Sequence, residues 1–138
     1  MTARDVEAVI RKHTVGPVWS QVGVDRGSLR LDLVHIDDVR KIVTGYEIKV
    51  SRQDWRQDTK WPDYLPWCHK LYIVAPEGIV SLDDIDDRDV GLLIVRERAY
   101  GSKVATSLVT KRAARRRPMD PEQALPLLYH LIWRGVRA

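Results

Sequence analysis

Two acidic residues and one lysine lie inside segments that are otherwise typical of buried strands. Asp32 interrupts an apolar run at 29–34, and Glu47 and Lys49 lie in the run YEIKV at 46–50. An ionised carboxylate is unfavourable in such a place unless a cation or hydrogen bonds compensate its charge. Two carboxylates beside one ammonium can hold a divalent metal ion against a phosphodiester. The pattern predicts a metal-dependent nuclease with Asp32, Glu47 and Lys49 as its catalytic residues.

The segments that carry these residues are predicted to form a hairpin. Apolar and polar residues alternate at 29–36 and 41–50, which is typical of two strands joined by a tight turn. Glu47 and Lys49 are two residues apart and therefore share one face of their strand. The hairpin can bring Asp32 to the same face, beside Glu47.

Mg²⁺ or Mn²⁺ is the cofactor expected at this face, because both ions favour oxygen ligands. The predicted ligands are Asp32, Glu47 and the backbone carbonyl of Ile48. Lys49 would orient the attacking water or neutralise charge in the transition state.

The remaining pattern predicts an α/β protein. We expect a helix at 4–13, an ambiguous segment at 18–24 that could be a strand, helices at 51–60 and 62–68, and strands at 71–75, 91–95 and 104–109. A closing helix is expected within 119–136, with its start at Asp120-Pro121 or at Pro126. Ser51 is the expected cap of the second helix. This order predicts a single domain over residues 1–138, with a mixed central sheet flanked by helices.

Length and composition agree with a globular protein. The chain has 138 residues, of which 44% are hydrophobic, so it can bury a core without disulfides. It has no apolar run near 18 residues, and no membrane partner is expected. Cys68 is the single cysteine, which fits a reducing, cytoplasmic compartment.

Basic residues concentrate in one segment towards the C-terminal end. Between 96 and 117 the chain has eight basic residues and a single acidic one, Glu97. A segment of this kind attracts polyanions, and DNA is the predicted partner. The basic residues are Arg96, Arg98, Lys103, Lys111, Arg112, Arg115, Arg116 and Arg117.

The longer run around Glu47 resembles a known family. Residues 46–55, YEIKVSRQDW, and 68–76, CHKLYIVAP, are similar to the MmcB-type DNA-repair proteins of the PD-(D/E)XK nuclease superfamily. The resemblance covers about residues 29–80. It implies a restriction-endonuclease-like core, metal-dependent action on DNA in repair or recombination, and an intracellular protein of bacteria or phages. Leu31 stands where the superfamily motif has proline, which is a turn feature rather than a metal ligand.

The resemblance also implies contacts to DNA around the site. Lys60 and Tyr64 stand where some relatives have a Gln-x-x-x-Tyr pair near the metal and the DNA backbone, although Pro62 interrupts the segment. Arg52 is either a phosphate contact or an exposed residue at a helix start, and Glu7 is an accessory metal contact by analogy with first-helix acids of similar nucleases. The predicted nucleic-acid-binding residues are Arg52, Lys60, Tyr64, Lys111, Arg112, Arg115, Arg116 and Arg117.

Several aromatic and acidic residues have a structural interpretation. Of Trp55, Trp61 and Trp67, two are expected in the core, because a chain without phenylalanine must fill its core with other aromatic residues. Asp54 and Asp58 are expected to be solvated helix charges, with a role in holding Lys49 or Arg52 as the alternative.

Two further patterns do not predict a site. The neighbours Cys68 and His69 lack the spacing of zinc ligands, and no base partners the cysteine as a nucleophile. The acidic residues at 83–89 lack the pattern of an EF-hand and are expected to form a solvated loop.

Two other functions remain compatible with the sequence. A nuclease fold that has lost its chemistry would hold DNA or a repair partner without cleaving. A small basic protein that binds RNA or a protein would use the acidic pair and Lys49 only as an ion-pair cluster. A homodimer formed through the last helix or Trp133 is also left open.

Overall fold

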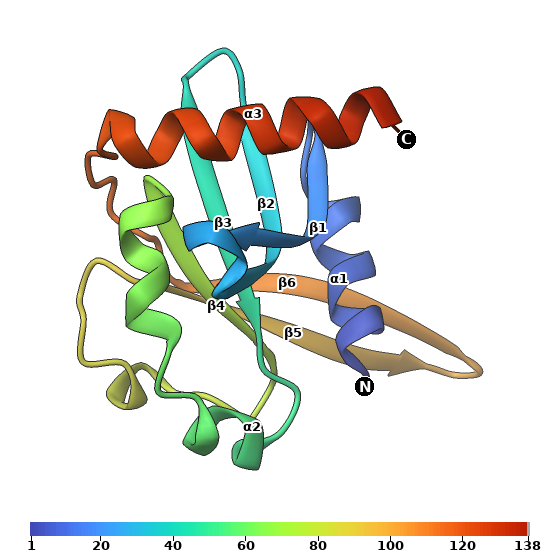
Figure 1. Cartoon of the computed structure of the whole chain (residues 1–138). Helices are drawn as coiled ribbons and strands as arrows, with labels where there is room; N and C mark the ends of the chain where they lie inside the picture. The colour runs from blue at the N-terminus through green and yellow to red at the C-terminus, as the bar shows by residue number, and fades with distance from the viewer. Residues whose placement is uncertain (138) are drawn as a thin grey trace.

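The computed structural model describes residues 1–137 as a twisted six-stranded mixed sheet flanked by helices (Figure 1). The strands are β1 (Val18–Val24), β2 (Leu29–Asp37), β3 (Ile42–Ile48), β4 (Lys70–Pro76), β5 (Gly91–Tyr100) and β6 (Lys103–Arg112). The helices are α1 (Ala3–Lys12), α2 (Arg52–Gln57) and α3 (Pro121–Arg137), with 3-10 turns η1 (Asp25–Gly27), η2 (Trp61–Trp67) and η3 (Leu82–Asp84). The predicted α/β class, with a mixed central sheet flanked by helices, is confirmed.

The strands follow one another across the sheet in chain order. The pairs β1–β2, β2–β3 and β5–β6 are antiparallel, whereas β3–β4 and β4–β5 are parallel. The parallel strands β3, β4 and β5 therefore end at the same edge of the sheet. This edge matters for function, because Glu47 lies near the end of β3 and Lys49 directly follows that strand.

Helix α1 covers one face of the sheet. Val6, Val9 and Ile10 recur at helical spacing and are buried in a cluster that includes Tyr46 and Val74. Burial of each such aliphatic side chain contributes roughly 1.5–3 kcal/mol. This packing holds the face of β3 that lies opposite to Glu47.

The other face is covered by α2, η2 and α3. Trp55 and Trp61 stack there with ring centroids 6.1 Å apart, and Leu127 and Leu131 of α3 are each 2% exposed. Trp55 and Trp61 belong to the core, whereas Trp67 is only partly buried. The expectation that two of these three tryptophans are core residues is confirmed.

Some element boundaries differ from the predicted ones. The segment 18–24 is a strand, and Pro126 lies inside α3 without ending it. Ser51 caps α2 as predicted, but α2 ends at Gln57 rather than at residue 60. The reason is Asp58, which leaves the helical conformation and accepts hydrogen bonds from the next backbone amides.

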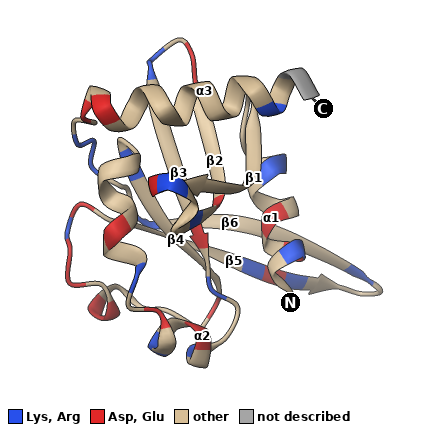
Figure 2. Ribbon diagram, viewed as in Figure 1, with Lys and Arg blue, Asp and Glu red and all other residues tan. Residues whose placement is uncertain are grey.

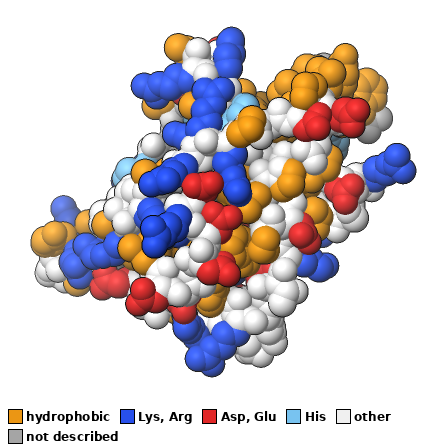
Figure 3. Space-filling view, turned by 90° about the vertical axis from the view of Figure 1, so that its left-hand side faces the viewer, with side chains coloured by type: hydrophobic (Ala, Val, Ile, Leu, Met, Phe, Trp, Pro, Cys, Tyr) orange, Lys and Arg blue, Asp and Glu red, His pale blue; other side chains and the backbone are white. Residues whose placement is uncertain are grey.

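Helix α3 has a second apolar face that points outward. Its residues are between 37% and 68% exposed, and they are Leu125, Leu128, Tyr129, Ile132 and Trp133. Figure 3 shows hydrophobic side chains gathered at the upper right, over α3. Within residues 1–137, no helix is long and apolar enough to cross a membrane.

Candidate functional site

The acidic pair lies where β2 and β3 separate. The ladder between these strands runs from Asp37 and Ile42 to Leu33 and Tyr46, and it stops there. Continuing the same register would place Asp32 directly opposite Glu47. The hairpin therefore brings both carboxyl groups together on the predicted face.

Side chains replace the missing ladder bonds. The Asp32 amide donates to Oε1 of Glu47 at 3.1 Å, and the Ile48 amide donates to Oδ2 of Asp32 at 2.8 Å. Each carboxyl group is thus fixed by backbone of the opposite strand. Within residues 1–137, each contact uses one oxygen of its carboxyl group, and the other oxygen accepts no backbone hydrogen bond.

Burial makes the pair hard to ionise. Glu47 is 4% exposed, and desolvation, together with the charge of Asp32, raises its pKa to about 8. Burial also raises the pKa of Asp32, although the Ile48 amide and the Lys49 ammonium oppose that shift. Near neutral pH the two carboxyl groups together therefore keep one proton.

Lys49 is held by Asp58, a role that sequence analysis offered only as the alternative for this residue. Its ammonium lies 2.5 Å from Oδ2 of Asp58, and both side chains are nearly buried, at 13% and 9% exposure. The interpretation of Asp58 as a solvated helix charge is therefore wrong. Asp58 lies beyond the end of α2, and this turn points its carboxylate back to the strand.

Two more side chains complete the surroundings of the pair. The Gln21 side chain hydrogen-bonds the Asp32 carboxyl, and its residue has a φ of 52° inside β1. A non-glycine residue with this conformation inside a strand is strained, and such strain is frequent at functional sites. Tyr64 is the second of these side chains, and it is buried. Burial and the charges of Glu47 and Asp58 raise the pKa of its hydroxyl to about 12.

Three other predicted site residues, Glu7, Arg52 and Lys60, do not lie at the acidic pair. Arg52 forms two hydrogen bonds with the Asp84 carboxylate, at 2.5 Å and 2.9 Å, and a third with a backbone carbonyl. Lys60 is exposed at the start of η2. Glu7 pairs with Arg11 on α1, which packs against the sheet face opposite to the pair.

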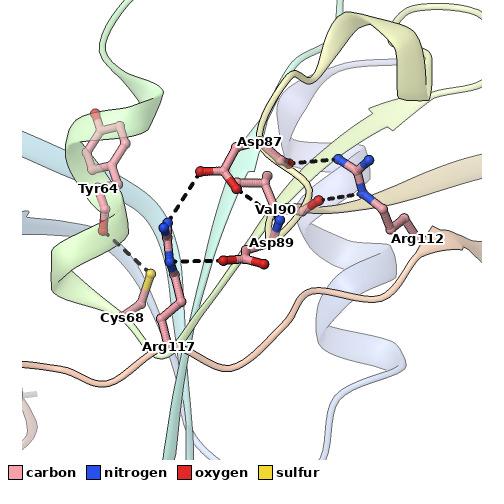
Figure 4. Close-up of polar contacts among 7 residues, drawn as sticks. All are labelled: Tyr64, Cys68, Asp87, Asp89, Val90, Arg112 and Arg117. Atoms are coloured by element: carbon pink, nitrogen blue, oxygen red, sulfur yellow. Dashed lines mark hydrogen bonds and ion pairs between the residues drawn. The ribbon is translucent and has the colours of Figure 1, made fainter.

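Part of the basic segment neutralises the acidic loop before β5 (Figure 4). Arg117 contacts Asp87 at 3.3 Å and Asp89 at 3.2 Å, and Arg112 donates to the carbonyls of Asp87 and Val90. These two arginines tie the loop to the segment after β6. The expectation of a solvated loop at 83–89 is therefore correct only in part, because Asp83 and Asp86 are exposed whereas Asp87 and Asp89 are bound by Arg117. The residues of the basic segment that stay exposed are Arg98, Lys103, Lys111, Arg115 and Arg116.

Cys68 and His69 have structural roles. Burial raises the pKa of Cys68 to about 12, so its thiol is a poor nucleophile, and its Sγ lies 3.6 Å from the Tyr64 carbonyl (Figure 4). The Val43 amide donates to Nδ1 of His69 at 2.9 Å. Burial and the charge of Arg116 lower the pKa of His69, which keeps its ring neutral.

In the acidic pair Glu47 is buried and Asp32 is half-buried. Hollows of about 520 Å³ and 440 Å³ flank Trp67, and neither is lined by Asp32 or Glu47. Across the described part of the chain, no group of three or more histidine, cysteine or acidic side chains is arranged to hold a metal ion. A bound ion would therefore have two carboxylates, with backbone or solvent oxygens as its other ligands.

Comparisons with known proteins place the chain in a family. A solved structure of a protein of unknown function from Silicibacter pomeroyi has the same fold, with a TM-score of 0.70 and 24% identity over 98% of this chain and 84% of that one. No curated protein matches the chain. Residues 1–124 match the family described as DNA repair protein MmcB-like. The acidic pair and its strands lie within this match, and the chain belongs to the MmcB-like DNA repair protein family.

Proposed function

We propose that this protein is a metal-dependent nuclease that hydrolyses phosphodiester bonds in DNA, with a site of the PD-(D/E)XK type. The observation that carries the proposal is the pair of Asp32 and Glu47, fixed at the point where two strands separate, with the ammonium of Lys49 close enough to influence both. The DNA-repair family supports DNA as the substrate.

The acidic pair suits a divalent cation. Burial raises the pKa of both carboxyl groups, which means that their ionised forms are costly without a counter-charge, and a bound cation would supply that charge. Asp32 and Glu47 offer the hard oxygens that Mg²⁺ and Mn²⁺ bind, and the carbonyl of Ile48 remains the third predicted ligand. When bound, such an ion polarises the phosphate and lowers the pKa of water.

The protein's own residues supply orientation and charge. The Ile48 amide fixes Asp32, and Gln21 supports the same carboxyl group. Asp58 holds the Lys49 ammonium, which would orient the attacking water or neutralise charge in the transition state. Because the pair holds a proton near neutral pH, binding of a cation must release that proton.

Cleavage of labelled single-stranded, duplex, nicked and branched DNA in Mg²⁺ or Mn²⁺ tests the proposal. Asp32→Asn and Lys49→Ala should each lower the rate by about 100-fold or more, as loss of a group that stabilises transition-state charge does elsewhere. Glu7→Gln is the matched control, since it removes a carboxylate on the other face of the sheet, and it should cut as the wild type does. If Asp32→Asn and Lys49→Ala retain wild-type rates, the catalytic assignment is wrong.

A second candidate is a nuclease fold that binds DNA or a repair partner without cutting. Two observations favour it: the burial of Glu47, and the pairing of Lys49 with Asp58. Titration with Mn²⁺ separates the candidates. A nuclease should bind the ion at a site that Asp32→Asn abolishes, and a pure binder should show no such site.

A further inference from the structure

The hairpin of β5 and β6 extends beyond the rest of the sheet. β4 accompanies β5 only as far as the pair of Pro76 and Val95, whereas β5 and β6 stay paired to Tyr100 and Lys103. We call residues 96–107 the arm. Figure 1 shows it projecting to the lower right, past the ends of the other strands. A two-stranded ribbon is marginally stable alone in water, so a partner that covers it would stabilise it.

One face of the arm is basic. Cross-strand pairing sets Arg98 opposite Ala105 and Tyr100 opposite Lys103, and these four residues share a face because they alternate along their strands. The acidic residue of the arm, Glu97, lies on the other face. Figure 2 shows the basic segments along β5 and near the tip of the hairpin.

The charges on this face are available to a ligand. Arg98, Tyr100 and Lys103 are exposed, Tyr100 at 67%, and within residues 1–137 neither basic residue has an ion-pair partner. Arg96, at the base of the arm, differs because it pairs with Glu77. Two unpaired cations beside a phenol and a small alanine, with the Glu77 carboxylate confined to the base of the arm, suit a phosphate backbone.

The register places this basic face on the same side of the sheet as the acidic pair. Glu47 lies beside Ile73, and Ile73 beside Leu92, so these three side chains share one face. Arg98 is six residues further along β5 and therefore returns to that face. At about 3.3 Å per residue, it lies roughly 20 Å beyond the level of Glu47 along the strand.

We propose that the arm binds duplex DNA, with its basic face along the sugar–phosphate backbone that flanks the acidic site. The statement that the bound DNA flanks the acidic site rests on the proposed nuclease function. Binding of DNA to the arm does not require cleavage. Two contact regions held about 20 Å apart match roughly six base pairs of a stiff duplex. Binders of single strands use several stacking aromatic residues, and the arm has one, Tyr100.

Fluorescence anisotropy tests the arm in the presence of EDTA, so that no cleavage occurs. The variant is Arg98→Ala/Lys103→Ala. The matched control is Lys12→Ala/Arg40→Ala, which removes the same charge from exposed positions away from the arm. The arm variant should bind a duplex of about 24 base pairs roughly 10-fold more weakly than wild type, and its log–log salt slope should be shallower by about two.

The control variant should keep the affinity and salt slope of the wild type. Both variants should also keep the wild-type urea midpoint, because the substituted side chains are exposed. Shortening the flank on one side of the duplex below about six base pairs should bring wild type down to the affinity of the arm variant. Equal effects of the two variants, or no effect of either, would overturn the proposal.

Three further outcomes test the choice of duplex DNA and separate the arm from the nuclease function. A larger loss for single-stranded than for duplex DNA would overturn the duplex assignment. Arm-dependent binding without any cleavage in Mg²⁺ or Mn²⁺ would leave the arm in place and refute the nuclease. If the arm variant binds and cleaves DNA as the wild type does, the proposed role of the arm is refuted and the nuclease function is not.

Discussion

Replacing Glu47 by glutamine should make the protein more stable than wild type at alkaline pH and equally stable at acid pH. The folded protein holds the Glu47 proton up to a pH of about 8, whereas the unfolded chain releases it near the ordinary value of 4.5. Between these values the folded state binds more protons, so the free energy of unfolding falls as the pH rises. The loss begins above about pH 4.5 and is complete above about pH 8.

The size of the effect follows from the width of this pH window. About 3.5 pH units separate the two pKa values, and each unit corresponds to about 1.4 kcal/mol, so the wild type loses at most about 5 kcal/mol. Glutamine has no such loss. Its side-chain oxygen can still accept the Asp32 amide hydrogen.

Urea unfolding followed by tryptophan fluorescence, from about pH 4 to 9 in EDTA, measures the effect. The two buried tryptophans, Trp55 and Trp61, provide the signal. Asp38→Asn is the matched control, because it removes an exposed carboxylate from the β2–β3 turn and should follow the wild type. Parallel pH profiles of wild type and Glu47→Gln would show that burial does not raise this pKa, and the argument for a proton-holding pair would fail.

Two other predictions concern the lysine and the last helix. Asp58→Asn should lower kcat for DNA cleavage by about 10-fold while the Kd for DNA stays unchanged, because Asp58 positions Lys49 and does not touch DNA; a change in Kd alone would contradict this role. The outward face of α3 should form a homodimer that buries its apolar residues, which expose on the order of 600 Å² per copy. Light scattering should then show about twice the 15.9 kDa of one chain, and Ile132→Glu should reduce it to one; a wild-type monomer at high concentration would refute the dimer.

The acidic pair was predictable because it depends on strand periodicity. Alternation along β3 put Glu47 and Lys49 on one face, and the hairpin register then brought Asp32 to Glu47. Both inferences use short-range rules. The fold class was predictable for the same reason, since each strand and each long helix has its own periodicity.

The partners of these residues were predictable only in part, because they depend on turns and long-range packing. The sequence offered Asp58 as a partner of Lys49 or Arg52 without deciding for it, and it gave no sign of Gln21. Asp58 reaches Lys49 only because α2 ends early at Gln57. Gln21 supports Asp32 through an unusual backbone conformation that the type of residue does not reveal. The acidic turn at Asp58 is, in retrospect, a signal for an early helix end.

The basic segment shows the same limit. Arg112 and Arg117 look alike in sequence to Arg115 and Arg116, yet the first two are engaged with the acidic loop some 22 to 30 residues away. Which arginines stay exposed is decided by the path of the chain after β6. Local charge density therefore indicates that the protein has a basic surface, but it does not identify which basic residues form that surface.

The way in which β2 and β3 separate has a consequence for divergence within the family. Each acid is oriented by the strand that carries or adjoins the other, so the two positions form one interlocked unit. If either acid is lost, the remaining carboxyl group keeps its backbone hydrogen bond, but the pair that would hold a cation no longer exists. Relatives should therefore retain both acidic residues or lose both. A relative with only one of them would have a site with a different function.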